Sequence, residues 1–318
     1  MTEIFSALVA RAAAYPSAPT AVVHPCDAPS LQGAADAARA GLIEPLLVGP
    51  RHRIDAAAAE LGLDISAWPR IDTRHSHESA EMAVAAVRQG RAEALMKGSL
   101  HTDELLHAVL AKETGLRTEK RLSHVFALEI PGQDRLHFIT DAAINIYPDL
   151  LAKADIVRNA IECVHALGIE RPKVAILSAV ETVTPKIPST VDAAALCKMA
   201  DRGQITGADL DGPLAFDNAV SVEAARIKGI RSPVAGRADI LVAPDMEAGN
   251  MIAKQLTFFA KARAAGVVMG ARAPIILTSR SDDATARLAS AAVAAVIAHA
   301  RRLAAAAAVI GEDGWRTT

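Results

Sequence analysis

Aromatic side chains and cysteines are scarce in this sequence of 318 residues. Aromatic residues make up only 3% of the chain, although 51% of it is hydrophobic. The core must therefore be built from Ala, Val, Leu and Ile, which favours helices packed on parallel strands over an aromatic-rich β-sandwich. The three cysteines, Cys26, Cys163 and Cys197, form no CxxC pair. Their spacing argues against a zinc site or a disulfide framework and predicts a reducing, cytoplasmic location.

Motifs of several ligand-binding classes are also missing. The formal net charge is only −2, and no basic stripe with interleaved aromatics is present, so we expect no nucleic-acid partner. The sequence contains neither GxGxxG nor GxxxxGK(S/T), which argues against a dinucleotide fingerprint and a P-loop. His75 and His77 have no third ligand nearby in the sequence, so no metal site is expected there.

No segment is typical of a membrane protein. Glu3 and Arg11 fall within the apolar N-terminal stretch, which indicates a short amphipathic helix and not a signal peptide. The longest apolar region, 288–310, is interrupted by His299 and two arginines, which favours a helix with one buried face over a membrane span. We therefore expect a soluble protein without a membrane partner.

Strand and helix patterns alternate along the whole chain, which predicts an α/β protein with mainly parallel sheets. A hairpin of strands Ser123–Leu128 and Leu136–Thr140 interrupts this rhythm, so the first domain is expected to end near Thr140 and the second to begin at Asp141. Ser30 is expected to cap a helix. The other predicted strands include Thr20–His24, Pro45–Val48, Ala94–Lys97, Lys173–Leu177, Ile205–Asp209 (followed by a loop over Asp211–Asp217), Ile240–Val242, Val267–Met269 and Pro274–Leu277.

The stretch Val267–Ala300 carries the main functional candidates. A strand leads into Ser279 and Arg280 at the start of a long Ala-rich helix, where free N–H groups and the helix dipole favour an anion. Arg280 adds a bidentate donor for phosphate or carboxylate. Asp282 and Asp283 are close enough in the sequence to act with the Ser279 hydroxyl. The alternative is that these residues only cap the helix, and spacing alone favours that interpretation.

Further candidates follow other strands, because ligands of open parallel sheets bind beyond the carboxyl ends of the strands. Lys97, Gly98 and Ser99 suit an anion but also fit a plain turn, and His101 is a possible base. Arg121 precedes a strand. Its side chain either reaches the same site as Lys97 or is a charge on the surface. The remaining candidates for substrate binding are Asp141, Asn145, Ser178, Glu181 and Asn250.

Together these segments resemble the phosphate acetyl/butyryltransferases. The resemblance runs from about Ala94 to Ala300, whereas the first ninety residues resemble the family only in their βα pattern. The stretches that carry it include MKGSLHTDELLHAVL, RLSHVF, FITDAAINIYPDL, KVAILSAVETVTPKIPST, ADILVAPDMEAGNMIAKQL and PIILTSRSDD.

The resemblance implies two α/β domains of three αβα layers, similar to isocitrate and isopropylmalate dehydrogenases, with the active site in the cleft between them. It implies that the C-terminal helix returns to the first domain, which then comprises 1–140 and about 281–318, with 141–280 as the second. It also implies reversible acyl transfer between coenzyme A and orthophosphate in a ternary complex. CoA is then a substrate, no tightly bound cofactor or metal is needed, and a homodimer is expected.

Residue roles also follow from the resemblance. Ser279 would help to deprotonate the CoA thiol, Arg280 would hold the phosphoryl group, and Arg121 matches an arginine of substrate binding. Acetyl-specific members of the family have an aspartate seven residues beyond the serine, whereas this chain has Ala286, so Asp282 or Asp283 would have to supply the base.

Several functions stay open at this point. Acetyl is the expected acyl group and butyryl the alternative, since the segment Ala179–Lys186 is closer to butyryltransferase sequences. A metal- and nicotinamide-dependent dehydrogenase of the related fold would use Asp141, Asp245 and Asp282 for its ion. The substitution at Ala286 motivates a third hypothesis, a non-catalytic CoA-ester-binding protein.

Overall fold

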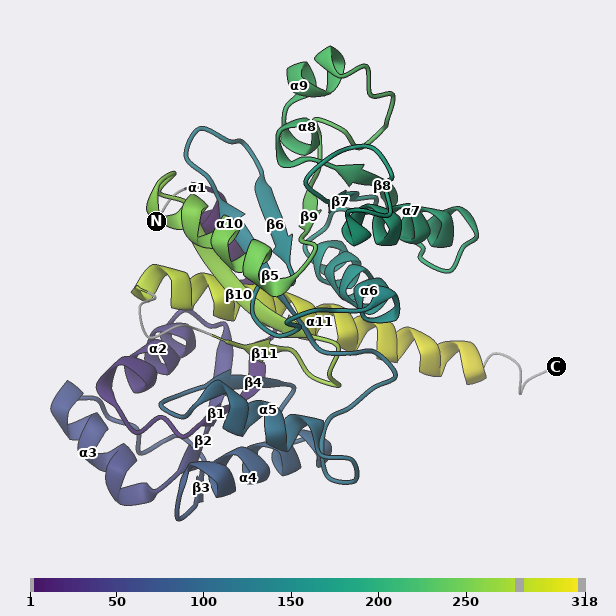
Figure 1. Ribbon diagram of the computed structural model, residues 1–318. Helices are drawn as coiled ribbons and strands as arrows, with labels where there is room; N and C mark the ends of the chain where they lie inside the picture. Colours follow the sequence, from purple (N-terminus) through teal and green to yellow (C-terminus); the bar gives the residue numbers. More distant parts are fainter. Residues whose placement is uncertain (1–2, 278–282, 314–318) are drawn as a thin grey trace. The chain divides into compact units, whose positions relative to one another are not determined.

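The computed structural model describes residues 3–277 and 283–313, with side chains up to residue 308. The chain forms two compact units, shown in Figure 1. Unit 1 comprises Glu3–Arg117 together with the described residues from Ala271 onward, and unit 2 comprises Thr118–Gly270. The hairpin expected at the end of the first domain therefore belongs to unit 2. The chain returns to unit 1 before the long C-terminal helix begins, not at it.

Unit 1 has a parallel set of strands in the order β3-β2-β1-β4-β11. Its strands are β1 (Ala18–Val23), β2 (Ile43–Gly49), β3 (Arg70–Asp72), β4 (Ala94–Lys97) and β11 (Ile275–Ile276). Its helices are α1 (Glu3–Ala13), α2 (Ala28–Arg39), α3 (Arg51–Leu61), α4 (Ser76–Arg88), α5 (Thr102–Leu110) and α11 (Ala284–Asp313).

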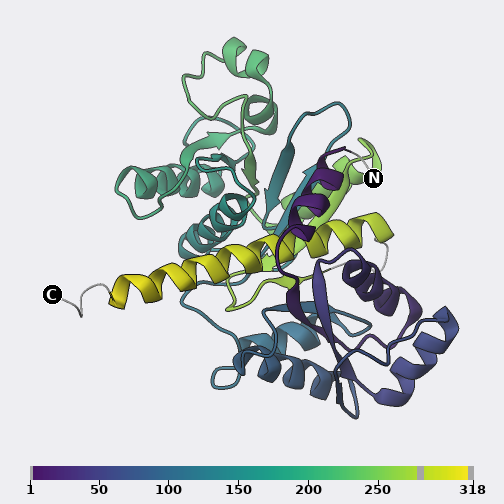
Figure 2. The same ribbon diagram turned by 180° about the vertical axis from the view of Figure 1, so that it is seen from behind.

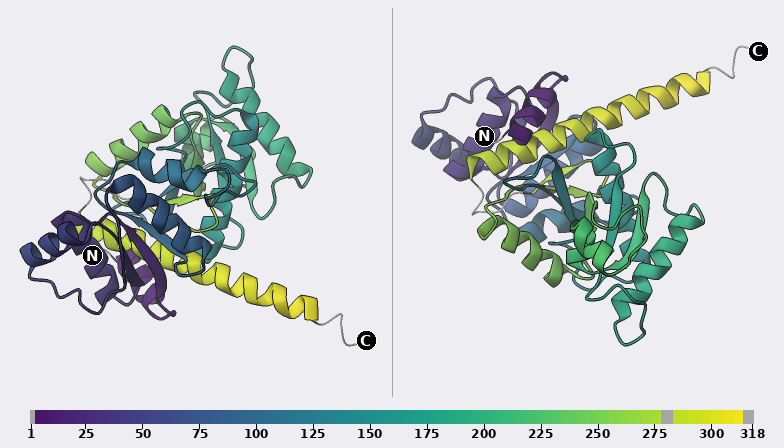
Figure 3. Two further views of the ribbon diagram at one scale, coloured as in Figure 1. Left: turned by 90° about the horizontal axis from the view of Figure 1, so that it is seen from below. Right: turned by 90° about the horizontal axis from the view of Figure 1, so that it is seen from above.

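The helices of unit 1 cover both faces of these strands. The chain runs from β1 to β3 in one direction and then crosses to β4 on the other side of β1. Because parallel crossovers are right-handed, α4 must lie on the face opposite to α2. Small residues allow close packing: α11 contacts α1 and α2 on one face, as Figures 2 and 3 show, and α4 contacts α5 on the other. Burial of β1 on both faces explains its run of apolar residues.

Unit 2 has the strand order β10-β5-β6-β9-β7-β8. The strand β5 is antiparallel to both neighbours, and the remaining strands from β6 to β8 are parallel. These strands are β5 (Ser123–Glu129), β6 (Leu136–Thr140), β7 (Lys173–Leu177), β8 (Asp209–Leu214), β9 (Ile240–Val242) and β10 (Arg263–Met269). The helices are α6 (Leu150–Ala166), α7 (Pro188–Asp201), α8 (Phe216–Val220), α9 (Val222–Ile227) and α10 (Met246–Phe258).

These arrangements confirm the predicted mainly parallel α/β class and the hairpin of β5 and β6. The pairing also explains where the units divide. β5 pairs with β10 over seven residues, from Ser123 with Met269 to Glu129 with Arg263, and β6 pairs with β9. Both hairpin strands are therefore held by partners that come later in unit 2.

Two local predictions were wrong. The strand expected over Ile205–Asp209 lies instead over Asp209–Leu214 and extends into the predicted loop over Asp211–Asp217. Gly212 and Pro213 suggest a turn in the sequence, but β8 is an edge strand, where a proline without an N–H group is tolerated. The helix α2 is capped by Asp27 and not by Ser30, whose N–H group donates to Asp27 Oδ1 at 2.9 Å.

The helix α11 has the length and composition of a membrane span over Ala284–Ala308, with a mean hydropathy of 1.4 in its most apolar window. In unit 1, however, residues 289–298 of this helix are buried against β11, β4 and β1. A buried core helix meets the same criteria of length and composition. Beyond Arg302 its alanines are exposed, and Figure 3 shows this end extending past the rest of unit 1.

Candidate active site

The carboxyl ends of β1 and β4 form the topological switch point of unit 1, because the chain turns to opposite sides of the sheet after these strands. Ligands of open α/β sheets bind at such points. Lys97 is the last residue of β4, and Gly98 and Ser99, the other two residues of the predicted anion-binding turn, follow it. His101 precedes α5 and is exposed, and its side chain makes no capping hydrogen bond.

The turn after β4 is held tightly against the end of β1. The Gly98 N–H group donates to Val23 O at 2.9 Å, and both the N–H group and the hydroxyl of Ser99 donate to His24 O at 2.9 Å. A Cβ atom on Gly98 would lie 2.4 Å from Val23 O, so only glycine allows this approach. The glycine is thus required by backbone packing at the switch point.

His24, which directly follows β1 and accepts hydrogen bonds from this turn, is a residue that the sequence did not single out. It is buried and has a positive φ of 54°, and its Nδ1 lies 3.0 Å from the Ser79 hydroxyl. Burial lowers the pKa of His24, and Arg53, whose Nη1 lies 3.4 Å from Nε2, lowers it further. The neighbouring Cys26 N–H group donates to Ser99 Oγ at 3.2 Å, and burial raises the pKa of the Cys26 thiol to about 11. A neutral histidine and a protonated thiol therefore support the turn.

Three of the four predicted catalytic residues, Ser279, Arg280 and Asp282, lie outside the described residues. The described chain on both sides belongs to unit 1. β11 runs parallel to β4 and pairs Ile276 with Met96, so it leaves the sheet at the carboxyl edge, as β4 does at Lys97. This is the edge at which ligands of such sheets bind.

Asp283, the fourth predicted catalytic residue, is described and exposed. Its Oδ1 accepts a hydrogen bond from the Ala286 N–H group at 2.8 Å, and its carbonyl accepts one from the Arg287 N–H group at 3.1 Å. Both bonds are those of a residue that caps the start of a helix. For this residue the geometry agrees with the capping interpretation.

In unit 2, Asp141 organises the loop after β6. Its Oδ1 accepts from the N–H groups of Ala143 and Ile144 at 3.0 and 3.2 Å and from His124 N at 3.3 Å. Its Oδ2 accepts from the N–H group of Asn145 at 3.0 Å and from its side-chain amide at 2.6 Å. The same amide donates to Leu122 O at 2.8 Å. Asp141 and Asn145 therefore fix the backbone of this loop.

The start of α10 packs against the same loop. Asp245 caps α10 by accepting from the Ala248 N–H group at 2.8 Å, and the Asn250 amide donates to Ala142 O at 3.1 Å. A Cβ atom on Gly249 would lie 2.4 Å from Asp141 O. The predicted residues Asp141, Asn145 and Asn250 thus come together at the carboxyl ends of β6 and β9.

Ser178 and Glu181 follow β7 at the same edge of unit 2. The Ser178 hydroxyl lies 2.8 Å from the Ser189 hydroxyl. Glu181 Oε2 accepts from Lys228 Nζ at 3.2 Å and from the Asn218 amide at 3.3 Å. Both side chains therefore already have partners within unit 2.

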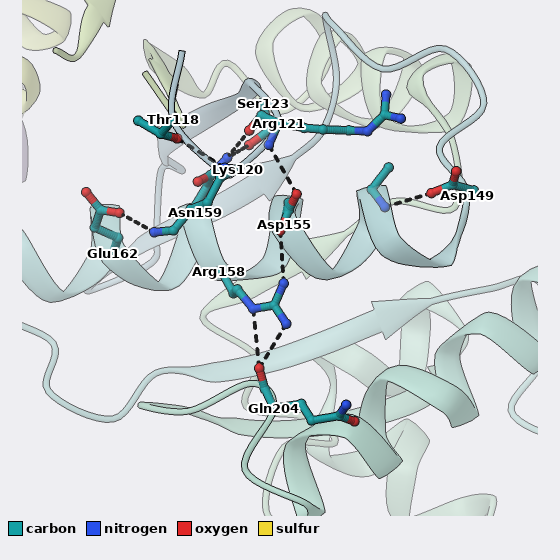
Figure 4. Close-up of polar contacts among 11 residues, drawn as sticks. Thr118, Lys120, Arg121, Ser123, Asp149, Asp155, Arg158, Asn159, Glu162 and Gln204 are labelled. Atoms are coloured by element: carbon teal, nitrogen blue, oxygen red, sulfur yellow. Dashed lines mark hydrogen bonds and ion pairs between the residues drawn. The ribbon is translucent and has the colours of Figure 1, made fainter. Parts of the chain in front are cut away.

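Arg121 is held by its backbone next to α6 (Figure 4). Its N–H group donates to Asp155 Oδ2 at 3.1 Å, and its carbonyl accepts from the Asn159 amide at 2.8 Å. The same amide donates to the Ser123 hydroxyl at 2.9 Å. Figure 4 shows the Arg121 side chain extended away from these groups. Its exposed guanidinium has no ion-pair partner among the described residues, which suits an arginine that binds an anionic ligand.

The dehydrogenase alternative finds no support in these carboxylates. Asp141 is saturated by N–H donors and Asp245 is a helix cap, whereas a metal ion needs free oxygen ligands. Within residues 3–277 and 283–308, no group of three or more His, Cys, Asp or Glu side chains is placed to hold a metal ion.

The architecture is that of the phosphotransacylases. It resembles the crystal structure of a branched-chain phosphotransacylase from Enterococcus faecalis V583 with a TM-score of 0.78 and 32% identity, covering 88% of this chain and 99% of that one. The family described as "Phosphate acetyl/butaryl transferase" matches residues 75–295. The chain belongs to this family of acyltransferases.

Two relatives bear on the acyl group. A protein of Rhizobium meliloti named phosphate acetyltransferase is 62% identical over 305 residues, which is 96% of each chain. A phosphate butyryltransferase of Clostridium acetobutylicum is 42% identical over 298 residues, which is 94% of this chain and 99% of the relative. The predicted family is confirmed.

Proposed function

We propose that this protein reversibly transfers an acetyl group between coenzyme A and orthophosphate. The observation that carries the proposal is the 62% identity, over 96% of both chains, to the relative named phosphate acetyltransferase. The lower identity to the phosphate butyryltransferase, 42%, makes butyryl the second candidate. The position of the glycine-bearing turn after β4, at the edge where β11 leaves the sheet, supports the proposal, because ligands of such sheets bind at this edge.

The reaction needs a thiolate and a stabilised leaving phosphate. The CoA sulfur attacks the carbonyl carbon of the acyl phosphate, the bond from that carbon to the phosphate oxygen breaks, and orthophosphate leaves with the electron pair. Asp282 accepts the thiol proton with the help of the Ser279 hydroxyl, and Arg280 neutralises the phosphate charge. Because both substrates are held together, orientation supplies part of the rate and no covalent acyl-enzyme is formed.

The other predicted residues have supporting roles in this proposal. Asp283 caps α11, so we assign the base to Asp282. Asp141 holds the loop of Asn145 in place, and Arg121 is available for the anionic part of CoA. CoA is a substrate in this scheme, and neither a metal nor a tightly bound cofactor takes part.

We further propose that the protein acts in the cytoplasm as a homodimer. Large apolar side chains are exposed along α10 and the adjoining segment 146–151 of unit 2. The N–H group of Met246 donates to Ile146 O at 3.1 Å, which places this segment beside the start of α10. Exposed apolar patches of this kind mark protein interfaces. The patch consists of Ile146, Tyr147, Leu151, Met251, Phe258 and Phe259.

The test is an assay of thioester formation from CoA with acetyl phosphate and with butyryl phosphate. We expect a higher kcat/KM with acetyl phosphate, since a pocket discriminates about 1–3 kcal/mol per methylene. Arg280→Ala should lower turnover by about 10²-fold, as loss of a transition-state charge donor does. Arg280→Lys, which keeps the charge but loses the bidentate geometry, should fall in between.

The outcomes separate the alternatives. A preference for butyryl phosphate would replace the acetyl assignment, and binding of CoA without any thioester formation would favour the non-catalytic hypothesis. Near-normal arsenate-dependent acyl-CoA breakdown by Arg280→Ala would remove Arg280 from the mechanism.

A further inference from the structure

A cavity of unit 1 lies at the amino ends of β4 and β11, opposite to the carboxyl edge of the candidate active site. Its volume is about 320 Å³. It is bounded by the last turn of α4, by the residues that precede β4 and β11, and by α11. Residues that define its chemistry are Arg88, Glu93, Leu116, Arg272, Arg301 and Arg302.

The charges around this cavity do not balance. Four arginines face one carboxylate, and that carboxylate is already matched, because Glu93 Oε2 lies 3.3 Å from Arg302 Nε. Arg302 also donates from Nη2 to Pro16 O at 2.7 Å, and Arg301 donates from Nη1 to Ala271 O at 3.1 Å. The lining therefore carries an excess of three positive charges.

Two of the four guanidinium groups are available for a ligand. Arg88 lies in the last turn of α4, and Arg272 precedes β11 with its backbone N–H group donated to Leu116 O at 2.9 Å. Neither side chain has a hydrogen bond or an ion pair within the part of the chain whose side chains the structure describes. Both side chains are exposed, whereas Arg301 and Arg302 are half-buried.

The rest of the lining is small and apolar, apart from the backbone of Gly90. Leu116 is fully buried, and the alanines of α11 and of the strand ends leave the space that the cavity occupies. An arginine-rich rim over an apolar floor suits a compact organic anion, because guanidinium groups bind phosphate and carboxylate oxygens in a bidentate manner.

We propose that this arginine-lined pocket is a binding site for a small organic phosphate that also carries a carboxylate. The phosphate and the carboxylate are held by Arg88 and Arg272, above Arg301 and Arg302. The volume is at the lower end of ligand pockets, which suits a phosphorylated metabolite of a few carbons and excludes a whole coenzyme. The four residues of β4 separate this pocket from the switch point, so its ligand is not a substrate of the proposed reaction.

The probe is 2-phosphoglycolate, titrated into the full-length protein in a calorimeter. We expect saturable binding to wild type and binding at least about tenfold weaker to the double variant Arg88→Gln/Arg272→Gln, because both charge-assisted guanidinium donors are lost. The matched control is Arg231→Gln/Arg237→Gln, which removes two exposed arginines of unit 2 and should bind within twofold of wild type. Glycolate, which lacks the phosphate, should not bind measurably.

A second arm separates this pocket from the active site. Arg280→Ala removes the proposed phosphate donor of the active site and should leave the binding of 2-phosphoglycolate unchanged. Wild-type affinity in Arg88→Gln/Arg272→Gln, equal loss in both double variants, or loss of all binding in Arg280→Ala would each overturn the proposal. Melting temperatures without ligand confirm that the variants are folded.

Discussion

At the scale of single residues, the candidate active site depends on backbone contacts that leave no room for a side chain. Gly98 is the clearest case, because the atoms that surround its Cα are carbonyls of β1 and of His24, which cannot rotate away. Such a contact specifies one residue type far more strictly than any charged group of the same turn does.

We expect Gly98→Ala to lower the free energy of unfolding by about 1–3 kcal/mol, as overpacking in a tight site does. The matched control is Gly33→Ala in α2, where the added Cβ meets only the Arg287 side chain, with the flexible Cδ nearest at 3.2 Å. That change should be neutral or stabilise by up to about 1 kcal/mol, because alanine favours helix. Urea unfolding compares the two, and equal stability would contradict the packing argument.

His124 provides a second residue-scale prediction. Burial lowers its pKa to about 4, although the nearby Asp141 opposes the shift, whereas the unfolded chain titrates near 6.5. Between these pH values the unfolded chain binds more protons, so stability is fully present above about pH 6.5 and falls as the pH drops towards 4. The loss should approach about 3 kcal/mol for a shift of this size.

The measurement is the free energy of unfolding at pH 7 and pH 4.5, for wild type and for His124→Phe. The pKa values of His24 and His137 are also lowered, chiefly by burial, so both proteins should lose stability on acidification. Wild type should lose more than the variant. The same pH dependence in both would show that His124 does not contribute.

At the scale of elements, Asp283, which caps the start of α11, allows a structural role to be separated from a catalytic one. Asp283→Ala should lower stability by about 1 kcal/mol, because the cap to the Ala286 N–H group is lost. Asp283→Asn keeps a capping oxygen but no carboxylate, and we expect it to retain both stability and turnover. Thermal unfolding and the thioester assay report the two properties separately, and an inactive but stable Asp283→Asn would instead identify Asp283 as the base.

Elements with strong apolar runs were predictable from sequence. The strands β4 and β7, with their ALMK and KVAIL segments, have the predicted bounds. The bounds predicted for β8 were wrong because Gly212 and Pro213 are turn residues. Only the position of β8 at the edge of the sheet makes them compatible with a strand. The local sequence does not show that β8 lies at the edge of the sheet.

At the scale of the whole molecule, the proposed homodimer makes a direct prediction. Phe258→Asp/Phe259→Asp places charges on side chains that are 69% and 85% exposed, so it should leave folding intact and shift the protein towards the monomer in light scattering. The control, Ile227→Asp, changes an exposed apolar residue of α9, outside the patch on α10 and 146–151, and should not alter the mass. A dimer that persists in the double variant would rule out this surface.

The site was predictable only in part, and the reason is the range of the contacts. Lys97, Gly98 and Asp141 lie at the ends of apolar strands and could be found from their positions alone. His24 could not, because its role depends on Ser99, which is 75 residues away, and the unit boundary depends on pairing between β5 and β10. Pairings of that range are not visible in a window of sequence.

Unit 1 is built from both ends of the chain, and this order has a consequence during translation. The ribosome delivers all of Thr118–Gly270 before β11 and α11 are made, so unit 2 can fold on the nascent chain while unit 1 still lacks the neighbour of β4 and the helix beside α2. A premature stop codon near codon 270 would therefore not trim a tail. It would leave unit 1 without β11 and α11, and we expect the incomplete unit to be degraded by proteases.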